Sequence, residues 1–169
     1  MATKVGRLLA EREIGLVFGG GQVGMMGHLA RATLAAGGHA TGVITRALIQ
    51  KEGPYEEHAR LQVVTTMHQR KQTMAKLSDA FLVLPGGFGS LEELFEILTL
   101  AQLNLHRKPC GLLNVRGYFD LLLEFLDHCV SQGFLPLADR RLLIVGSNPR
   151  KLLDEIEKRT AKTAASNKH

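Results

Sequence analysis

The stretch AFLVLPGGFGSLEELFEILTLAQL, residues 80–103, contains the repeating unit of this sequence in a single run. Ala80–Leu84 is a short apolar segment, typical of a strand that is buried on both faces. Three glycines follow at positions 86, 87 and 89, and Leu91–Leu103 then has the apolar spacing of an amphipathic helix. The stretch therefore predicts a strand, a glycine loop and a helix.

The same unit recurs along most of the chain. Strands are expected at Ile14–Phe18, Ala40–Ile44, Leu61–Val64, Ala80–Leu84, Cys110–Asn114 and Leu142–Val145. Helices are expected at Val5–Glu11, Gly24–Ala36, Met67–Leu77, Leu91–Leu103, Tyr118–Val130 and Pro149–Lys158, and a polar loop at Arg46–Arg60. This alternation predicts an α/β fold with a doubly wound parallel sheet, in which ligands bind at the carboxyl ends of the strands.

Composition predicts one globular domain over residues 1–157 and a basic, disordered tail over 158–169. Of the 169 residues, 45% are apolar and 22% are charged, and no apolar run is long enough to cross a membrane. The tail has four basic residues and no acid, so the net charge of +5 minus +4 leaves about +1 on the domain. Because there is no basic stripe with interleaved aromatic residues, we expect no nucleic-acid partner.

The cysteines and the N-terminus predict a cytoplasmic protein. Cys110 and Cys129 lie in apolar runs and have no partners at metal-ligand spacing, which favours reduced core thiols and no metal site. The first 15 residues, MATKVGRLLAEREIG, contain acids and lack the long apolar segment of a secretory signal.

The first glycine loop, Gly19–Gly24, fits the pattern G-x-G-x-x-G between a strand and a helix. A nicotinamide-binding domain also needs an acid near the end of the next strand, where this chain has only Val43–Arg46. An NAD(P) oxidoreductase is therefore disfavoured. The loop either packs helix on strand, with Gly24 and Gly27 allowing close contact, or also presents its backbone to a ligand.

The second glycine loop has two interpretations. Backbone N–H groups at a helix start favour a phosphate, and glycine lets the ligand approach closely. The loop is not a P-loop, because no lysine precedes Ser90. Alternatively, Ser90 is the N-cap and Glu93 completes a capping box, with Glu92 as an ordinary acid of the first turn.

Arg70 interrupts an apolar helix face. At helical spacing it shares that face with Met67, Met74 and Leu77. A buried guanidinium is costly unless it is paired. Arg70 therefore either snorkels or forms a structural ion pair, or it meets an anion or carboxylate at the strand ends.

Three motifs together resemble the LONELY GUY family of cytokinin riboside 5′-monophosphate phosphoribohydrolases. They are GGGQVGMMG at Gly19–Gly27, MHQRK at Met67–Lys71 and PGGFGSLEE at Pro85–Glu93. The resemblance implies a Rossmann-like fold, a homodimer, and hydrolysis of the N-glycosidic bond of a nucleoside 5′-monophosphate without metal or cofactor. It also implies a first strand that precedes the position where this chain begins, so the expected sheet lacks that strand.

The resemblance implies that Arg70 and Glu93 are catalytic. Together with the two loops, it predicts substrate-binding residues at Glu52, Lys71, Gly86, Gly87, Phe88, Gly89, Ser90, Glu92, Gly20 and Gly21. In this hypothesis the glycines hold the 5′-phosphate, while Glu93 stabilises positive charge on the ribose as the base leaves.

Two other functions compete with hydrolysis. A non-catalytic nucleotide or cofactor carrier on the same fold would bind nucleotide without releasing base. A lysine decarboxylase would need a lysine linked to pyridoxal phosphate and an acid facing the ring nitrogen, and nothing in the sequence indicates such a pair.

Overall fold

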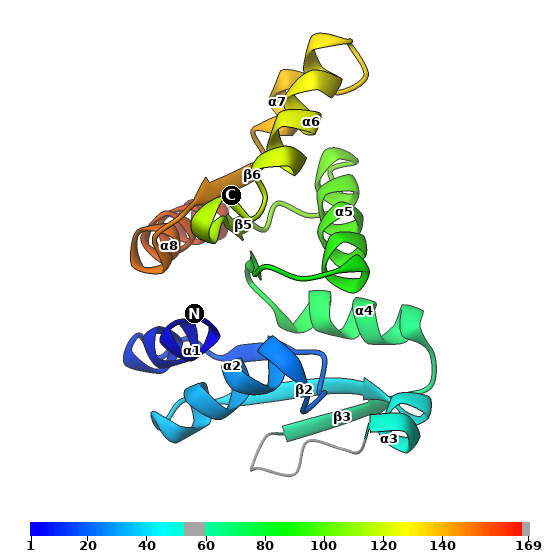
Figure 1. The fold of residues 1–169 in the computed structure, drawn as a ribbon, viewed down its shortest axis with the longest axis vertical. Helices are drawn as coiled ribbons and strands as arrows, with labels where there is room; N and C mark the ends of the chain where they lie inside the picture. The colour runs from blue at the N-terminus through cyan, green and yellow to red at the C-terminus, as the bar shows by residue number, and fades with distance from the viewer. Residues whose placement is uncertain (53–59, 167–169) are drawn as a thin grey trace. The chain divides into compact units, whose positions relative to one another are not determined.

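The computed structural model describes residues 1–52 and 60–166 (Figure 1). The chain divides into two compact units, Met1–Ser78 and Asp79–His169. Each unit contains a three-stranded sheet in which every strand pairing is parallel. The predicted α/β class with parallel strands is thereby confirmed.

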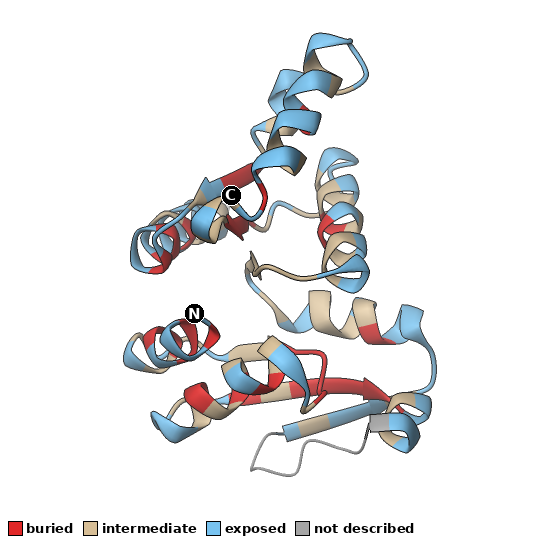
Figure 2. Ribbon diagram, viewed as in Figure 1, coloured by how far each residue is buried: buried red, intermediate tan, exposed pale blue. Residues whose placement is uncertain are grey.

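The first unit is built around strand β2. Its elements are α1 (Ala2–Glu11), β1 (Leu16–Phe18), α2 (Gly24–Ala35), β2 (Ala40–Thr45), α3 (Arg46–Glu52), β3 (Arg60–Val64) and α4 (Met67–Leu77). The strand order is β1-β2-β3, with Leu16 opposite Ala40 and Thr45 opposite Val64. β2 is the most buried of the three because it has a neighbour on each side (Figure 2).

The predicted loop at Arg46–Arg60 is wrong over its first half, because Arg46–Glu52 forms helix α3. The Thr45 hydroxyl accepts a hydrogen bond from the Leu48 N–H at 3.3 Å, which satisfies one donor of the first turn. The glycine and proline that suggested a loop come only after this helix.

The second unit is built around strand β5. Its elements are β4 (Phe81–Val83), α5 (Phe88–Gln102), β5 (Cys110–Leu113), the 3-10 turn η1 (Val115–Gly117), α6 (Asp120–Ser131), α7 (Leu137–Arg140), β6 (Leu143–Gly146) and α8 (Pro149–Ser166). The strand order is β4-β5-β6, and all four residues of β5 are buried. Gly111 lets α8 pack directly on β5, since a Cβ there would meet the side chain of Ile156.

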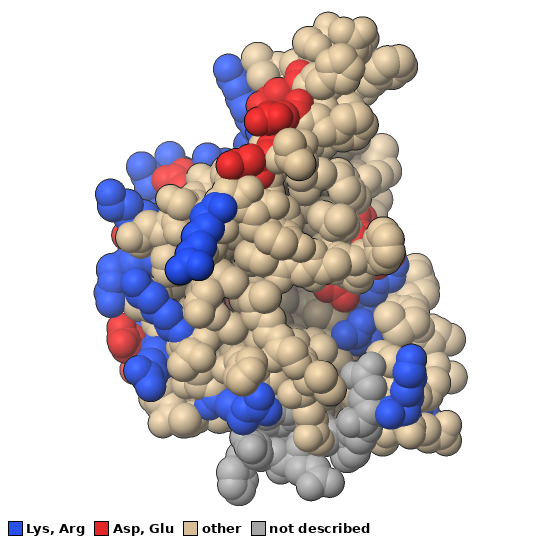
Figure 3. All heavy atoms as spheres, in the orientation of Figure 1, with Lys and Arg blue, Asp and Glu red and all other residues tan. Residues whose placement is uncertain are grey.

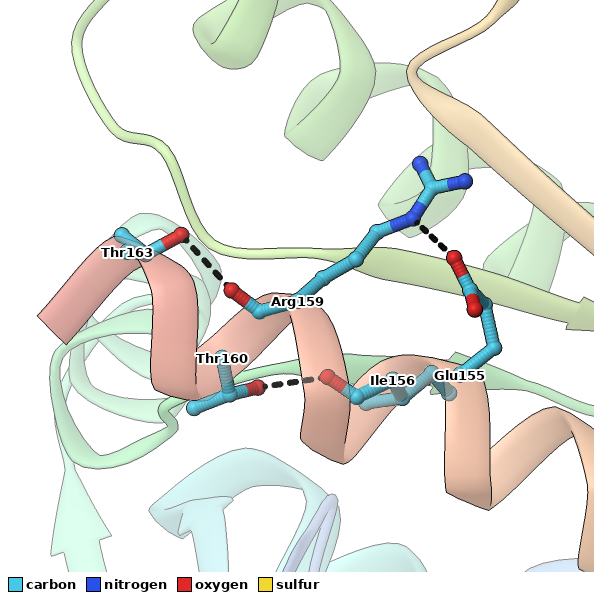
Figure 4. Close-up of polar contacts among 5 residues, drawn as sticks. All are labelled: Glu155, Ile156, Arg159, Thr160 and Thr163. Carbon is cyan, nitrogen blue, oxygen red and sulfur yellow. Dashed lines mark hydrogen bonds and ion pairs between the residues drawn. The ribbon is translucent and has the colours of Figure 1, made fainter. Parts of the chain in front are cut away.

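Helix α8 does not end at Lys158 as the sequence pattern predicts but continues through Ser166. Arg159 pairs with Glu155 one turn earlier, with Nε and Oε1 2.7 Å apart (Figure 4). The hydroxyls of Thr160 and Thr163 donate to the carbonyls of Ile156 and Arg159, at 2.9 and 3.1 Å. Thr163 also contacts the carbonyl of Arg107 at 3.2 Å, which ties the basic segment to the loop before β5.

His106 is held in one neutral tautomer. Its Nδ1 accepts a hydrogen bond from the Lys108 N–H at 3.1 Å, so its Nε2 is the protonated nitrogen that donates to the Ile97 carbonyl at 3.0 Å. Burial lowers the pKa of His106 below its ordinary value of 6.5; the Ile97 hydrogen bond opposes that effect and the Lys108 cation adds to it.

This lowered pKa predicts a pH-dependent stability. Because the unfolded chain binds a proton at His106 more readily, the free energy of unfolding should be highest above pH 6.5 and fall as the pH drops through the lowered folded pKa. Urea denaturation between pH 5 and pH 8 measures this, with His106→Gln as the comparison. Identical pH profiles for the two proteins would contradict the assignment.

Two further observations concern residues 1–52 and 60–166. Each helix there is too short or too polar to span a bilayer. No group of three or more His, Cys, Asp or Glu side chains lies together at metal-binding distances in the same ranges.

Candidate active site

The loop after β4 presents the start of helix α5. Gly87 is the N-cap, and the first hydrogen bond of the helix runs from the Leu91 N–H to the Gly87 carbonyl at 3.1 Å. The N–H groups of the first three helical residues, 88–90, therefore have no preceding helical carbonyl to bond to. Together with the positive end of the helix dipole, they favour an anion at this point.

The glycines of this loop serve different purposes. A Cβ on Gly86 would overlap the Ser90 hydroxyl, so the turn can close over Ser90 only with glycine at this position. A Cβ on Gly87 or Gly89 would meet nothing within 4 Å, which leaves their backbone open to approach. Phe88, between them, is 93% exposed.

The capping-box interpretation of Glu93 is wrong. Helix α5 begins at Phe88, three residues before the predicted start, and its N-cap is Gly87 rather than Ser90. Ser90 is thus the third residue of the helix, while Glu92 and Glu93 lie beyond its first turn. Glu93 is half-buried and Glu92 is exposed. The position of Glu93 is therefore not explained by capping.

Helix α4 is fixed at its start by a capping box that the sequence analysis missed. The Thr66 hydroxyl accepts from the Gln69 N–H at 3.1 Å, and the Gln69 side chain accepts from the Thr66 N–H at 3.3 Å. The pattern T-x-x-Q at residues 66–69 is typical of a capping box and could have predicted it. Because this cap sets the first turn, it also sets the direction in which Arg70 leaves the helix.

Arg70 is buried, with 8% of its surface exposed, and its guanidinium bonds to two backbone carbonyls. Nε donates to the Val43 carbonyl at 2.9 Å and Nη2 donates to the Gly19 carbonyl at 3.1 Å. Val43 belongs to β2 and Gly19 directly follows β1, so Arg70 joins α4 to the carboxyl-terminal part of two strands. Snorkelling is thereby excluded.

The first glycine loop is close-packed, but the predicted packing of helix on strand through Gly24 and Gly27 is wrong, because a Cβ on Gly24 would meet nothing within 4 Å. A Cβ on Gly19 would overlap Nη2 of Arg70, and a Cβ on Gly27 would overlap the Gln22 carbonyl. The close approach at Gly27 is thus made to the loop backbone rather than to a strand. Gly20 has a φ of +73° and, like Gly21, is buried. Ligand contact at Gly20 and Gly21 remains a prediction.

The predicted residues fall into two groups, one in each unit. Gly20, Gly21, Arg70 and Lys71 belong to the first unit, and Gly86–Ser90, Glu92 and Glu93 belong to the second. Lys71 follows Arg70 on α4 and is half-buried. Glu52 is the last residue of α3, and its side chain lies outside the described part of the chain.

Tyr118 contacts the second glycine loop, and the sequence did not predict this contact. Its hydroxyl donates to the Gly86 carbonyl at 2.9 Å. The sequence pattern placed Tyr118 inside a helix, whereas α6 begins at Asp120 and Tyr118 lies in the preceding turn. No local signal in the sequence indicates a contact across 32 residues.

Comparison with known proteins identifies the family. A family model described as possible lysine decarboxylase matches residues 26–156. Cytokinin riboside 5′-monophosphate phosphoribohydrolase LOG7 of Arabidopsis thaliana is 46% identical over 156 residues, which cover 92% of this chain and 72% of LOG7. The chain belongs to the LONELY GUY family.

Two further proteins show how much of the chain is similar in sequence and in fold. The probable cytokinin riboside 5′-monophosphate phosphoribohydrolase LOGL5 of Oryza sativa subsp. japonica is 47% identical over 156 residues, and this chain spans only 63% of its length. The molybdenum cofactor binding protein of Rippkaea orientalis has a TM-score of 0.66 at 22% identity, covering 93% of this chain and 84% of its own. That likeness shows a shared Rossmann-like fold, as the LONELY GUY resemblance implies.

Proposed function

We propose that this chain hydrolyses the N-glycosidic bond of a nucleoside 5′-monophosphate, a cytokinin riboside 5′-monophosphate or AMP. One observation carries the proposal: a glycine loop opens onto the start of α5, with Glu93 one turn further, in a chain 46% identical to LOG7. In the reaction the bond between C1′ and the base nitrogen breaks. The oxygen of water bonds to C1′ and a proton of water goes to the base, which gives free base and ribose 5-phosphate.

The glycine loop and Glu93 act on opposite charges at the two ends of the substrate. In this proposal Gly86, Gly87, Phe88, Gly89 and Ser90 hold the 5′-phosphate. Residues three apart share a helix face and lie about 4.5 Å apart along its axis, so Glu93 is on the Ser90 side of α5. A phosphate bound at Ser90 would therefore bring the ribose toward the Glu93 carboxylate, which stabilises the developing cation.

The remaining residues have supporting roles in the proposal. Arg70 is the second proposed catalytic residue, and it also maintains the first glycine loop through its bond to the Gly19 carbonyl. The other proposed substrate-binding residues are Glu52, Lys71, Glu92, Gly20 and Gly21. Both glycines lie in the loop that Arg70 holds.

We also propose that the enzyme is a cytoplasmic homodimer. Helix α6 exposes Leu121 and Phe125, which are 80% and 61% accessible and lie one turn apart. Phe134, shortly after the helix, is 87% accessible. Large apolar side chains exposed one turn apart on a helix favour association with another surface. The two cysteines, Cys110 and Cys129, are free thiols, which fits a reducing compartment.

The test is base release, measured by chromatography after incubation with AMP and with isopentenyladenine riboside 5′-monophosphate. Free base is expected from at least one nucleotide. The matching nucleoside, which lacks the phosphate, should react with at least about tenfold lower kcat/KM, because it loses the contacts that position the ribose. Nucleotide binding without base release would contradict the proposal, and equal rates for nucleoside and nucleotide would contradict the phosphate role.

A further inference from the structure

The turn after β5 reaches over to the glycine loop after β4. Strands β4 and β5 pair in parallel, with Val83 opposite Leu112, so the segments that follow them leave the same edge of the sheet. The Tyr118 hydroxyl spans these segments and donates to the Gly86 carbonyl at 2.9 Å. This hydrogen bond links the glycine loop to a neighbouring part of the same unit.

The turn that carries Tyr118 is built in a defined shape. Arg116 and Gly117 both have left-handed backbone conformations, with φ of 53° and 70°. The Asn114 side chain accepts from the Phe119 N–H at 2.8 Å and donates to Asp120 at 2.7 Å. These contacts close the turn between the end of β5 and the start of α6.

The Tyr118 ring is also held on one side. It packs edge-on against Phe119, with the ring centroids 4.9 Å apart and an interplanar angle of 89°. Phe119 is only 2% exposed, so this support is part of the core. Tyr118 is itself 56% exposed, which means that its removal costs little packing.

The bond to Gly86 sets the direction of a neighbouring N–H group. The Gly86 carbonyl and the Gly87 N–H belong to one planar trans peptide and point in opposite directions. Tyr118 therefore directs the Gly87 N–H away from itself. Glycine has more conformational freedom than any other residue, so an outside contact matters most at this position.

We infer that Tyr118 is a positioning residue that orients the Gly86–Gly87 peptide for the 5′-phosphate. The inference rests on the proposed function for the identity of the ligand. The phenol acts through the loop backbone rather than on the reacting atoms. Its loss should thus weaken phosphate binding and leave the bond-breaking step nearly unchanged.

The Tyr118→Phe variant removes only the hydroxyl. We expect its Kd for ribose 5-phosphate, measured by titration calorimetry, to rise about three- to tenfold. KM for the nucleotide should rise by a similar factor, kcat should stay within about twofold, and the melting temperature should match that of the wild type. The kcat/KM for the corresponding nucleoside should not change. Tyr118→Leu, which also removes the ring, should weaken ribose 5-phosphate binding at least as much.

The outcomes separate this inference from the proposed function. If the wild type releases no base but binds ribose 5-phosphate more tightly than Tyr118→Phe, the hydrolase proposal fails and the positioning role stands. Equal ribose 5-phosphate affinity in wild type and variant would overturn the positioning role. Absence of ribose 5-phosphate binding by the wild type would overturn it as well.

Discussion

Replacing Glu93 by glutamine should lower kcat for base release by about a hundredfold or more. Glutamine keeps the size and polarity of the side chain but removes the negative charge that would stabilise the ribose cation. Glu93 is half-buried, and glutamine fills the same volume, so we expect the variant to fold. Steady-state kinetics by chromatography, with a thermal melt of each protein, measures both effects.

Glu92→Gln is the matched control for this experiment. It makes the same chemical change one residue away, on an exposed side chain of the same helix. We expect kcat to change less than about tenfold, because a residue one position along a helix points about 100° away, and we expect the proposed substrate contact of Glu92 to affect KM instead. Wild-type kcat in Glu93→Gln, or equal losses in the two variants, would refute the catalytic assignment.

Replacing Arg70 by alanine should lower the free energy of unfolding by about 2–5 kcal/mol and also abolish most base release. The variant removes the buried donors that satisfy the Val43 and Gly19 carbonyls at 2.9 and 3.1 Å. Each carbonyl left without a partner costs about 1–3 kcal/mol. Urea denaturation measures the loss of stability, and a stability equal to that of the wild type would refute the role of these two bonds.

A Gly19→Ala variant tests whether the position of the Arg70 guanidinium matters as well as its charge. In Gly19→Ala the new methyl group would overlap Nη2 of Arg70, so the guanidinium can move only by giving up buried hydrogen bonds. We expect a stability loss of about 1–3 kcal/mol and reduced base release, although the arginine remains. Gly15→Ala is the control, because a Cβ at Gly15 meets nothing within 4 Å.

The amino-acid composition shows where the basic residues lie in the sequence but not what structure they form. On the face that Figure 3 shows, Lys and Arg side chains lie among Asp and Glu side chains. The sequence located the excess charge in residues 158–169, and the structure shows that residues 158–166 belong to helix α8. The ion pair and threonine bonds that continue this helix follow i,i+4 spacing, yet low apolar content hid them from a prediction based on hydrophobic periodicity.

The site was predictable where it depends on local sequence. Strand, glycine loop and helix follow one another at residues 81–102 as the pattern predicts, and α4 has the predicted bounds, Met67–Leu77. The start of α5 was not predictable from the apolar pattern, since Phe88 and Gly89 extend the helix without belonging to its apolar face. That three-residue difference decides whether Glu93 serves as part of a cap.

By itself the sequence determined the alternation of buried strands and helices, the two glycine loops and the family, because these depend on periodicity and on motifs of adjacent residues. Only the tertiary structure decided what Arg70 and Tyr118 contact. The partners of Arg70 lie 27 and 51 residues away, and that of Tyr118 lies 32 residues away. Each bond goes to a backbone carbonyl, a group that every residue carries, so no side-chain pattern could have identified these partners before the strands were placed side by side.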